Sequence, residues 1–321
     1  MRRRDLLRRT VAAGLGASAA RLLGGSALLP FVDGARAAGS SSVPVGVPAS
    51  LVATPATIEV WPGYPATLQT VNAVYPSPTI RVRRGDLFDV LLENQLAEET
   101  NLHWHGLAPP PEADGHPLDV VQPGGTKRYT FQVEERAGTY WYHPHPDMRT
   151  AAQVYGGMAG FFLVEDDDEL ALGLPSGAYD VPLLLQDRRI TPDRSFLYAP
   201  TMMDMMHGYL GDTILVNGVP DAEMQVAAGA YRFRLLNGAN ARVFRVAFED
   251  RRVFQVIAGD GGLLDRPVPA TEFFLSPGER AEIYVDFSRF ETDRAPAKIG
   301  GSVDVRDDDG RGAVAGHVAV E

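Results

Sequence analysis

Short stretches in which apolar and polar residues alternate recur along most of the chain. In Ile80-Arg-Val-Arg83 and Tyr129-Thr-Phe-Gln-Val133 every second residue is apolar, as in a β-strand with one buried and one solvated face. Glycines, prolines and Asn-Gly pairs separate these stretches and predict tight turns. No long segment shows the 3.6-residue period of an amphipathic helix. The pattern therefore predicts an all-β protein.

The predicted strands form two groups, over residues 51–165 and 178–321, joined by an acidic and glycine-containing segment that includes Asp166–Glu169. Short strands separated by turns at this density are typical of Greek-key sandwiches, so we expect two tandem β-sandwich domains. Residues 38–50, rich in Ser, Pro, Gly and Val, predict a flexible linker before the first domain. The expected strands are 57–60, 67–71, 79–83, 87–93, 129–133, 138–143 and 161–164, then 181–186, 213–216, 231–236, 242–248, 251–257, 272–275, 282–287 and 313–321.

The first 37 residues have the pattern of an export signal. Consecutive arginines at 2–4 precede a weakly apolar, Ala/Gly-rich stretch from Val11 to Pro30, and Ala35-Arg-Ala37 supplies a small-x-small cleavage pattern. Arg21 and the glycines make this stretch a poor transmembrane anchor. We therefore expect export by the twin-arginine route to the periplasm, cell envelope or extracellular space, with no stable membrane anchor.

The charge balance excludes one class of partner. The 321 residues carry a net charge of −11. Residues 1–37 hold seven Arg against two Asp, a net of +5, which leaves −16 for residues 38–321. Such an acidic surface argues against nucleic acid as a partner.

Four of the seven histidines occur in two His-x-His pairs, His103/His105 and His143/His145. Residues i and i+2 of a strand point to the same face, about 6.5–7 Å apart. Two such strands side by side would gather four imidazoles, donors that suit Cu, Zn, Fe or Ni. The alternative is four histidines hydrogen-bonded in a polar core.

The residues around these pairs resemble the multicopper oxidase family, which includes laccase, bilirubin oxidase and cuprous oxidase. The resemblance covers about residues 50–290 and implies cupredoxin folds for both domains. Similar to the family's first domain are Asn101-Leu-His-Trp-His-Gly106, Gly138-Thr-Tyr-Trp-Tyr-His-Pro-His145 and Gly156-Gly-Met-Ala-Gly-Phe-Phe-Leu-Val164; similar to its middle domain are Gly211-Asp-Thr-Ile-Leu-Val-Asn-Gly218, Tyr231-Arg-Phe-Arg-Leu-Leu-Asn237 and Ser276-Pro-Gly-Glu-Arg280.

The resemblance implies a role for each histidine. His103 matches a type 2 copper ligand, and His105, His143 and His145 match ligands of the type 3 copper pair. In the family this trinuclear cluster reduces dioxygen to water with electrons from a type 1 copper. Asp114 matches an acidic residue that relays protons to the cluster; it is equally explained as a turn aspartate before Gly115, and the two roles are compatible.

The chain departs from the family in two respects. We expect the third domain, with the remaining histidine motifs, to be missing from this chain, and the 321 residues contain no cysteine to ligate type 1 copper. We therefore expect a copper-binding chain that holds half of the trinuclear site, has no type 1 site and is inactive alone. Its partners would be dioxygen, a reducing substrate and a separate chain carrying a third cupredoxin domain, whose packing face should be exposed and apolar.

Two other functions remain open. One is a non-catalytic exported scaffold, as in a relative of these oxidases that acts in cell division and lacks the copper ligands. The other is copper storage or delivery, because Thr201-Met-Met-Asp-Met-Met-His207 holds four methionines and thioethers favour Cu(I). Against the second stands the interpretation that these methionines pack a loop against the neighbouring domain.

Overall fold

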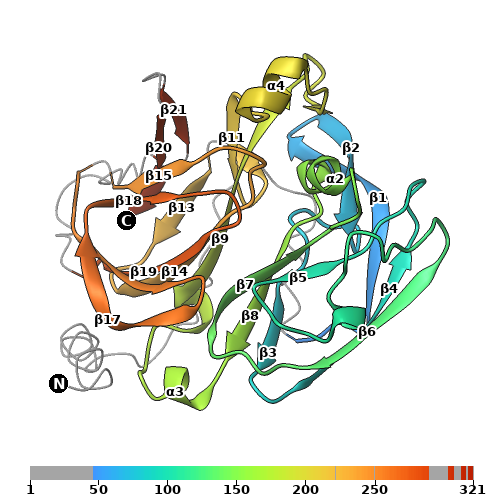
Figure 1. Ribbon diagram of the computed structural model, residues 1–321. Helices are drawn as coiled ribbons and strands as arrows, with labels where there is room; N and C mark the ends of the chain where they lie inside the picture. The colour runs from blue at the N-terminus through green and yellow to red at the C-terminus, as the bar shows by residue number, and fades with distance from the viewer. Residues whose placement is uncertain are drawn as a thin grey trace.

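The computed structural model describes residues 46–220, 222–248 and 250–288 and three short strands nearer the C-terminus (303–306, 312–315 and 317–320). The described chain forms two β-sandwiches that lie side by side, with only short helices (Figure 1). The predicted all-β fold with two tandem sandwich domains is therefore confirmed. The predicted export signal, residues 1–37, and residues 38–45 of the predicted linker lie outside the described residues.

Two four-stranded sheets make the first sandwich. Aromatic side chains fill the space between them: the Trp104 ring contacts Phe88 and Tyr129 edge-on, at centroid distances of 4.8 and 5.3 Å. One sheet has the order β2-β1-β4-β6, with β1 (Ser50–Trp61), β2 (Tyr64–Val71), β4 (Leu87–Asn94) and β6 (Thr126–Gln132); the other has the order β3-β8-β7-β5, with β3 (Ile80–Arg83), β5 (His103–His105), β7 (Gly138–His143) and β8 (Gly160–Glu165). β1 begins at Ser50, the last residue of the predicted linker.

The second sandwich contains one large sheet and three strand pairs. The large sheet runs β12-β11-β9-β14-β19-β16-β17, with β10 paired to β9. Its strands are β9 (Asp180–Ile190), β10 (Phe196–Leu197), β11 (Thr213–Val216), β12 (Val219–Pro220), β14 (Ala230–Asn237), β16 (Phe254–Gly259), β17 (Gly262–Ala270) and β19 (Arg280–Asp286). The pairs join β15 (Phe244–Ala247) to β18 (Glu272–Leu275), β13 (Glu223–Val226) to β22 (His317–Val320), and β20 (Val303–Arg306) to β21 (Gly312–Ala315).

The helices in the described residues are all short. They are η1 (Pro111–Ala113), α2 (Thr150–Gly156), α3 (Asp167–Leu170), η2 (Gly177–Tyr179) and α4 (Met202–His207). None of them has the length and apolar character needed to cross a membrane. α3 lies in the acidic segment between the domains, where Asp166 caps it by accepting a hydrogen bond from the Glu169 amide. The predicted join is thus an ordered helix.

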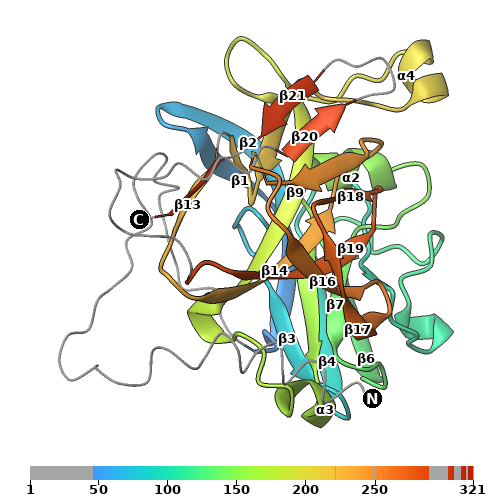
Figure 2. The same ribbon diagram turned by 90° about the vertical axis from the view of Figure 1, so that its left-hand side faces the viewer.

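β7 and β8, two strands of the first sandwich, lie in the middle of the molecule on the side that faces the second sandwich (Figure 1). Figure 2 views the molecule from the second domain, so that β14, β16 and β19 are in front of the first domain. Both strands are buried on both faces. Alternate residues such as Tyr142 and Phe162 belong to the first core, whereas Trp141, Phe161 and Leu163 pack against Leu184 and Leu236 of the second domain. This double burial explains why these segments contain nearly continuous apolar residues. The strand that leads to the second histidine pair is therefore enclosed by both domains.

A network of buried charged side chains also joins the two domains, next to β7. Arg234 donates from Nε to Asp180 (2.7 Å) and from Nη1 to Glu282 (3.1 Å). Thr139 of β7 donates its hydroxyl proton to the same Glu282, at 2.7 Å, and Arg232 pairs with Glu169 of α3. Burial disfavours the ionised form of Glu282, but the two arginines outweigh it and lower the pKa of that carboxyl. The network ties α3 and β7 to the large sheet.

Candidate metal centre

Strand pairing brings the two His-x-His motifs together. In the antiparallel pair of β5 and β7, His103 lies opposite His143 and His105 lies opposite Trp141. Because successive strand residues alternate between faces, these four side chains share one face of the sheet, and the residues between them point into the first core. His145 follows two residues after the end of β7.

The four rings form one cluster. Ring centroids are 5.1 Å apart for His103 and His145, 5.5 Å for His103 and His143, 5.5 Å for His105 and His143, 5.8 Å for His103 and His105, and 5.9 Å for His143 and His145. These distances do not set His103 apart from the other three, so its assignment to a separate type 2 copper stays a prediction.

The ring nitrogens have the spacing of metal ligands. One nitrogen from each of His103, His105 and His143 lies within 4.8 Å of the others. His105 Nδ1 and His143 Nε2 are 3.3 Å apart, about the separation of two nitrogens bonded to one tetrahedral ion at about 2.0–2.1 Å. His145 is outside this set of nitrogens, although its ring adjoins that of His103.

Hydrogen bonds fix which nitrogen two of the rings offer. His103 Nδ1–H donates to the Asp114 carbonyl and His143 Nδ1–H to the Pro144 carbonyl, both at 2.8 Å, so the Nε2 of each ring carries the lone pair that could bind a metal. His145 Nδ1 is buried and has no hydrogen-bond partner among the residues that the structure describes, so it too could serve as a ligand. A cluster of neutral imidazoles with unused nitrogens fits copper.

Burial favours the uncharged form of three of the rings, those of His105, His143 and His145. It lowers the pKa of His143 to about 3 and that of His105 to about 4, with the Arg280 guanidinium adding to the effect. Burial and the neighbouring His103 also lower the pKa of His145. Because an imidazole must be deprotonated to bind a metal, these three rings are ready to act as ligands without an acid–base change.

Acid should destabilise the metal-free protein through the same groups. Unfolded histidines take up protons near pH 6.5, whereas His143 in the fold stays neutral down to about pH 3. The unfolded state then binds more protons, so the free energy of unfolding falls as the pH drops from about 6.5 towards 4. At about pH 5 His143 contributes on the order of 2 kcal/mol of this loss. Chemical denaturation at pH 7 and pH 5 should show a smaller difference for His143→Gln than for the wild type; equal differences would contradict the expectation.

Asn101, just before β5, links the loop after β5 to the segment that carries His145. The Asn101 side chain donates to the His116 carbonyl (2.9 Å), and its Oδ1 accepts from the His145 amide (2.7 Å). Gly115 has a φ of +77°, and a Cβ there would lie 2.0 Å from the Leu102 carbonyl oxygen, so only glycine fits. This role of Asn101 was not predicted, although the residue opens the first motif.

Asp114 lies at the end of η1, beside His103. Its carboxylate Oδ1 is 3.3 Å from His103 Nδ1, and 40% of its side chain is exposed. It therefore connects solvent to the ring that it orients, and the proton-relay role stays a prediction.

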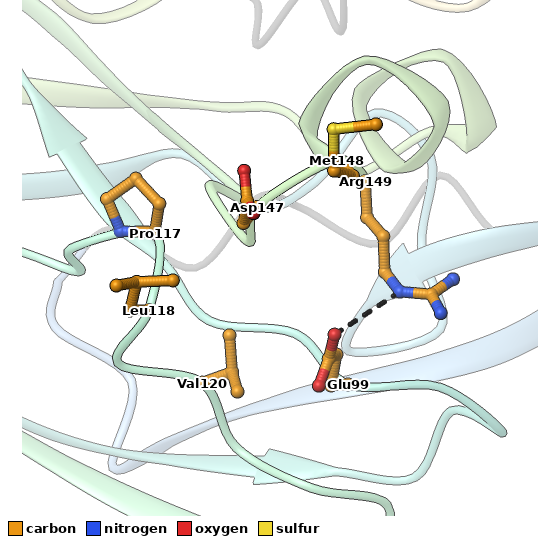
Figure 3. A pocket seen from close by; sticks show the side chains of 7 residues that line it. All are labelled: Glu99, Pro117, Leu118, Val120, Asp147, Met148 and Arg149. Carbon is orange, nitrogen blue, oxygen red and sulfur yellow. Dashed lines mark ion pairs between the residues drawn. The ribbon is translucent and has the colours of Figure 1, made fainter.

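A hollow opens beside the segment that carries His145 (Figure 3). Three segments form it: one contains Glu99, and the others are residues 117–120 and 147–149. The Asp147 amide donates a hydrogen bond to the Pro117 carbonyl (3.0 Å), and Arg149 forms an ion pair with Glu99 (3.5 Å). Two large apolar side chains of this rim are exposed, Leu118 at 74% and Met148 at 95%. The lining residues are Glu99, Pro117, Leu118, Val120, Asp147, Met148 and Arg149.

Both domains match models of known protein families. Residues 53–169 and residues 197–294 each match a model described as multicopper oxidase. The chain belongs to the multicopper oxidase family. Membership implies copper binding and confirms the resemblance found in the motifs.

Relatives of the chain include proteins named for different roles. Multicopper oxidase mco of Staphylococcus aureus is 38% identical over 217 residues, which are 68% of this chain and 48% of that protein. Cell division protein FtsP of Escherichia coli is 37% identical over 233 residues, 71% of this chain and 48% of FtsP. The chain thus spans about half the length of the curated relatives that it matches.

Solved structures agree with the cupredoxin-like fold. A laccase-like multicopper oxidase, CueO from Ochrobactrum sp., superposes with a TM-score of 0.77 and 34% identity, covering 87% of this chain and 64% of that one. McoA multicopper oxidase from Aquifex aeolicus gives a TM-score of 0.75 and 36% identity, covering 87% and 62%.

Proposed function

We propose that this chain binds copper and supplies half of the ligands of a trinuclear copper cluster. In this proposal His103 ligates the type 2 copper, and His105, His143 and His145 ligate the type 3 pair. The observation that carries it is the set of imidazole nitrogens within 4.8 Å of one another, two of them on rings whose other nitrogen is held by a backbone carbonyl. In the complete form, copper would supply the redox chemistry that couples one-electron substrate oxidation to four-electron reduction of O₂ to water.

The residues of this chain prepare the site for that chemistry. The Asp114 carbonyl fixes the His103 tautomer, and its partly exposed carboxylate is placed to pass a proton between solvent and the site. Because the chain contains no cysteine, the usual type 1 ligand set must come from elsewhere. We propose a partner chain that carries a third cupredoxin domain, seated over the histidine face and the exposed Leu118 and Met148, and we expect no oxidase activity from this chain alone.

One observation favours a second function, copper storage or delivery. The methionine-rich segment forms the helix α4, whose N-terminus is capped by a capping box of Thr201 and Asp204. Its four methionines, Met202, Met203, Met205 and Met206, are 60–70% exposed. The interpretation that they pack a loop against the neighbouring domain is therefore wrong: the segment is helical, and its thioethers face outwards, where soft Cu(I) can reach them.

The scaffold function rests on similarity to FtsP alone. The clustering of four histidines at one site is a feature that a scaffold does not need, and we place this function behind the other two. For localisation we propose export by the twin-arginine route to the periplasm, cell envelope or extracellular space, based on the motif at residues 1–37.

Copper titration of the purified chain separates the three functions. We expect Cu(II) to bind at the histidine cluster, seen by elemental analysis and electron paramagnetic resonance, with no oxidation of phenolic dyes in air. Cu(II) binding should be the same after Met202, Met203, Met205 and Met206 are all replaced by leucine. Tight Cu(I) binding that this variant loses, without Cu(II) at the histidines, would favour storage or delivery. If no copper binds above background, the result supports the non-catalytic scaffold. If the chain alone oxidises the dye, the proposal that it holds only half of the copper cluster is wrong.

A further inference from the structure

The second domain reaches the histidine cluster through the turn between β18 and β19. At Gly278, with a φ of +80°, a Cβ would lie 3.5 Å from His105 Cε1, 3.8 Å from His105 Nε2 and 3.8 Å from Trp141 Cζ2. The backbone of this turn therefore lies against the edge of the His105 ring. The neighbouring ring atom Nδ1 faces His143 Nε2.

His105 needs such a contact more than His103 and His143 do. His103 and His143 are each held by a hydrogen bond from Nδ1 to a backbone carbonyl. Among the described residues, the hydrogen bond recorded for the His105 ring goes to another ring of the cluster, that of His143. Its orientation thus depends on packing, against Trp141 at a centroid distance of 4.9 Å on one side and against the Gly278 turn on the other.

Arg280 holds this turn in place. Its guanidinium donates from Nε to the Thr139 carbonyl of β7 (3.0 Å), from Nη1 to the Gly278 carbonyl (2.9 Å) and from Nη2 to the Asp260 carbonyl (3.2 Å). Three acceptors on three segments need the fixed fork of a guanidinium. The side chain is 4% exposed, so these bonds are shielded from water.

The same guanidinium lies on the backbone next to His105. A Cβ at Gly106 would come within 2.6 Å of Arg280 Nη2 and 3.0 Å of Tyr140 Cδ1. Gly106, whose φ is +89°, therefore leaves the space that the guanidinium occupies. Arg280 thus contacts both the turn that packs on the ring and the residue that follows His105.

We propose that Gly278 and Arg280 are positioning residues for His105, which hold its ring so that Nδ1 faces His143 Nε2. The proposal rests on the histidine cluster proposed above as a copper site and extends it to the second domain. Groups that orient a metal ligand typically contribute 10–100-fold in metal affinity. The second domain, which contributes none of the four histidines, would then be part of the metal site.

A pair of glycine variants tests this in the full chain. Gly278→Leu places a side chain where the His105 ring lies, whereas Gly63→Leu adds the same side chain at a φ of +78° with no atom within 4 Å of its Cβ. Both variants carry similar backbone strain. We expect the imidazole nitrogen signals of His105 in the metal-free protein, measured by ¹⁵N nuclear magnetic resonance, to shift only in Gly278→Leu. Copper affinity should fall 10–100-fold in that variant and stay unchanged in Gly63→Leu.

Arg280→Lys provides a second test if Gly278→Leu does not fold. Lysine keeps the positive charge but cannot serve three acceptors in a fork, so we expect the His105 signals to shift more than those of His103. If Arg280 had a purely structural role, Arg280→Lys would lower the melting temperature without shifting the His105 signals more than those of His103. Unchanged His105 signals in every folded variant would overturn the proposal. Shifted His105 signals in a chain that binds no copper would support the positioning role while refuting the copper site.

Discussion

Replacing His143 with glutamine should weaken copper binding by the full chain at least 100-fold. His143 is the most enclosed ligand candidate, with 6% of the residue exposed, and its ring lies 5.5 Å from those of both His103 and His105. Loss of a group that merely orients a ligand costs about 10–100-fold in metal affinity, so loss of the ligand itself should cost more. A competition titration against a copper-binding indicator measures the change.

His116→Gln is the matched control for this prediction. His116 lies outside the cluster, in the loop between β5 and β6, and is exposed; its Nδ1 accepts a hydrogen bond from the Leu118 amide (3.2 Å). Its replacement should leave copper affinity unchanged. Equal losses in the two variants would mean that copper binds nonspecifically to histidines, and an unchanged affinity in His143→Gln would remove His143 from the site.

Replacing Arg234 with methionine should lower the free energy of unfolding by about 3–5 kcal/mol, the usual cost of removing one partner from a buried ion pair. Arg234 is 1% exposed and pairs with Asp180 and Glu282. Without it, Arg232 and the partly buried Arg81, which pairs with Asp180 at 3.2 Å, would have to balance three buried carboxylates, those two and Glu169. Methionine fills a similar volume, so the loss reflects charge rather than a cavity. Thermal and denaturant unfolding of the variant give the change.

Arg128→Met is the control on the surface. Arg128 pairs with Asp89 at 2.5 Å, but the arginine side chain is 62% exposed, where water and salt screen the pair. Its replacement should leave the midpoint of unfolding nearly unchanged. An equally stable Arg234→Met protein would show that the network between the domains adds little to stability.

The strands were largely predictable because their signal is local. The predicted ranges 213–216 and 272–275 coincide with β11 and β18, and most others differ by a few residues at their ends. The short strands β10, β12, β13 and β20 were not predicted, and neither was the longer β17, because Pro267 and Pro269 break its strand pattern. The structure places β17 at the edge of the large sheet, where a strand tolerates residues without an amide hydrogen.

Two short helices were not predicted, although each has local signals of its own. The acidic join contains α3, and the methionine-rich segment is α4, which starts with the Thr-x-x-Asp pattern of a capping box. Each is under two turns long, too short for a hydrophobic period to be visible. Glu169 in α3 is buried against Arg232, a partner 63 residues away that no local pattern reveals.

The amino-acid order alone specified the class of fold and the four histidines as the candidate donors. The two-residue period of a strand guarantees that His103 and His105 share a face, as His143 and His145 would in a continued strand. Which nitrogen each ring offers was decided only in three dimensions, by the carbonyls of Asp114 and Pro144. The packing of the Gly278 turn against His105 was also decided only in three dimensions, because Arg280, which holds this turn, is 141 residues from its acceptor at Thr139. Side-chain alternation is a property of neighbouring residues, whereas the orientation of a ring depends on whatever the folded chain packs against it.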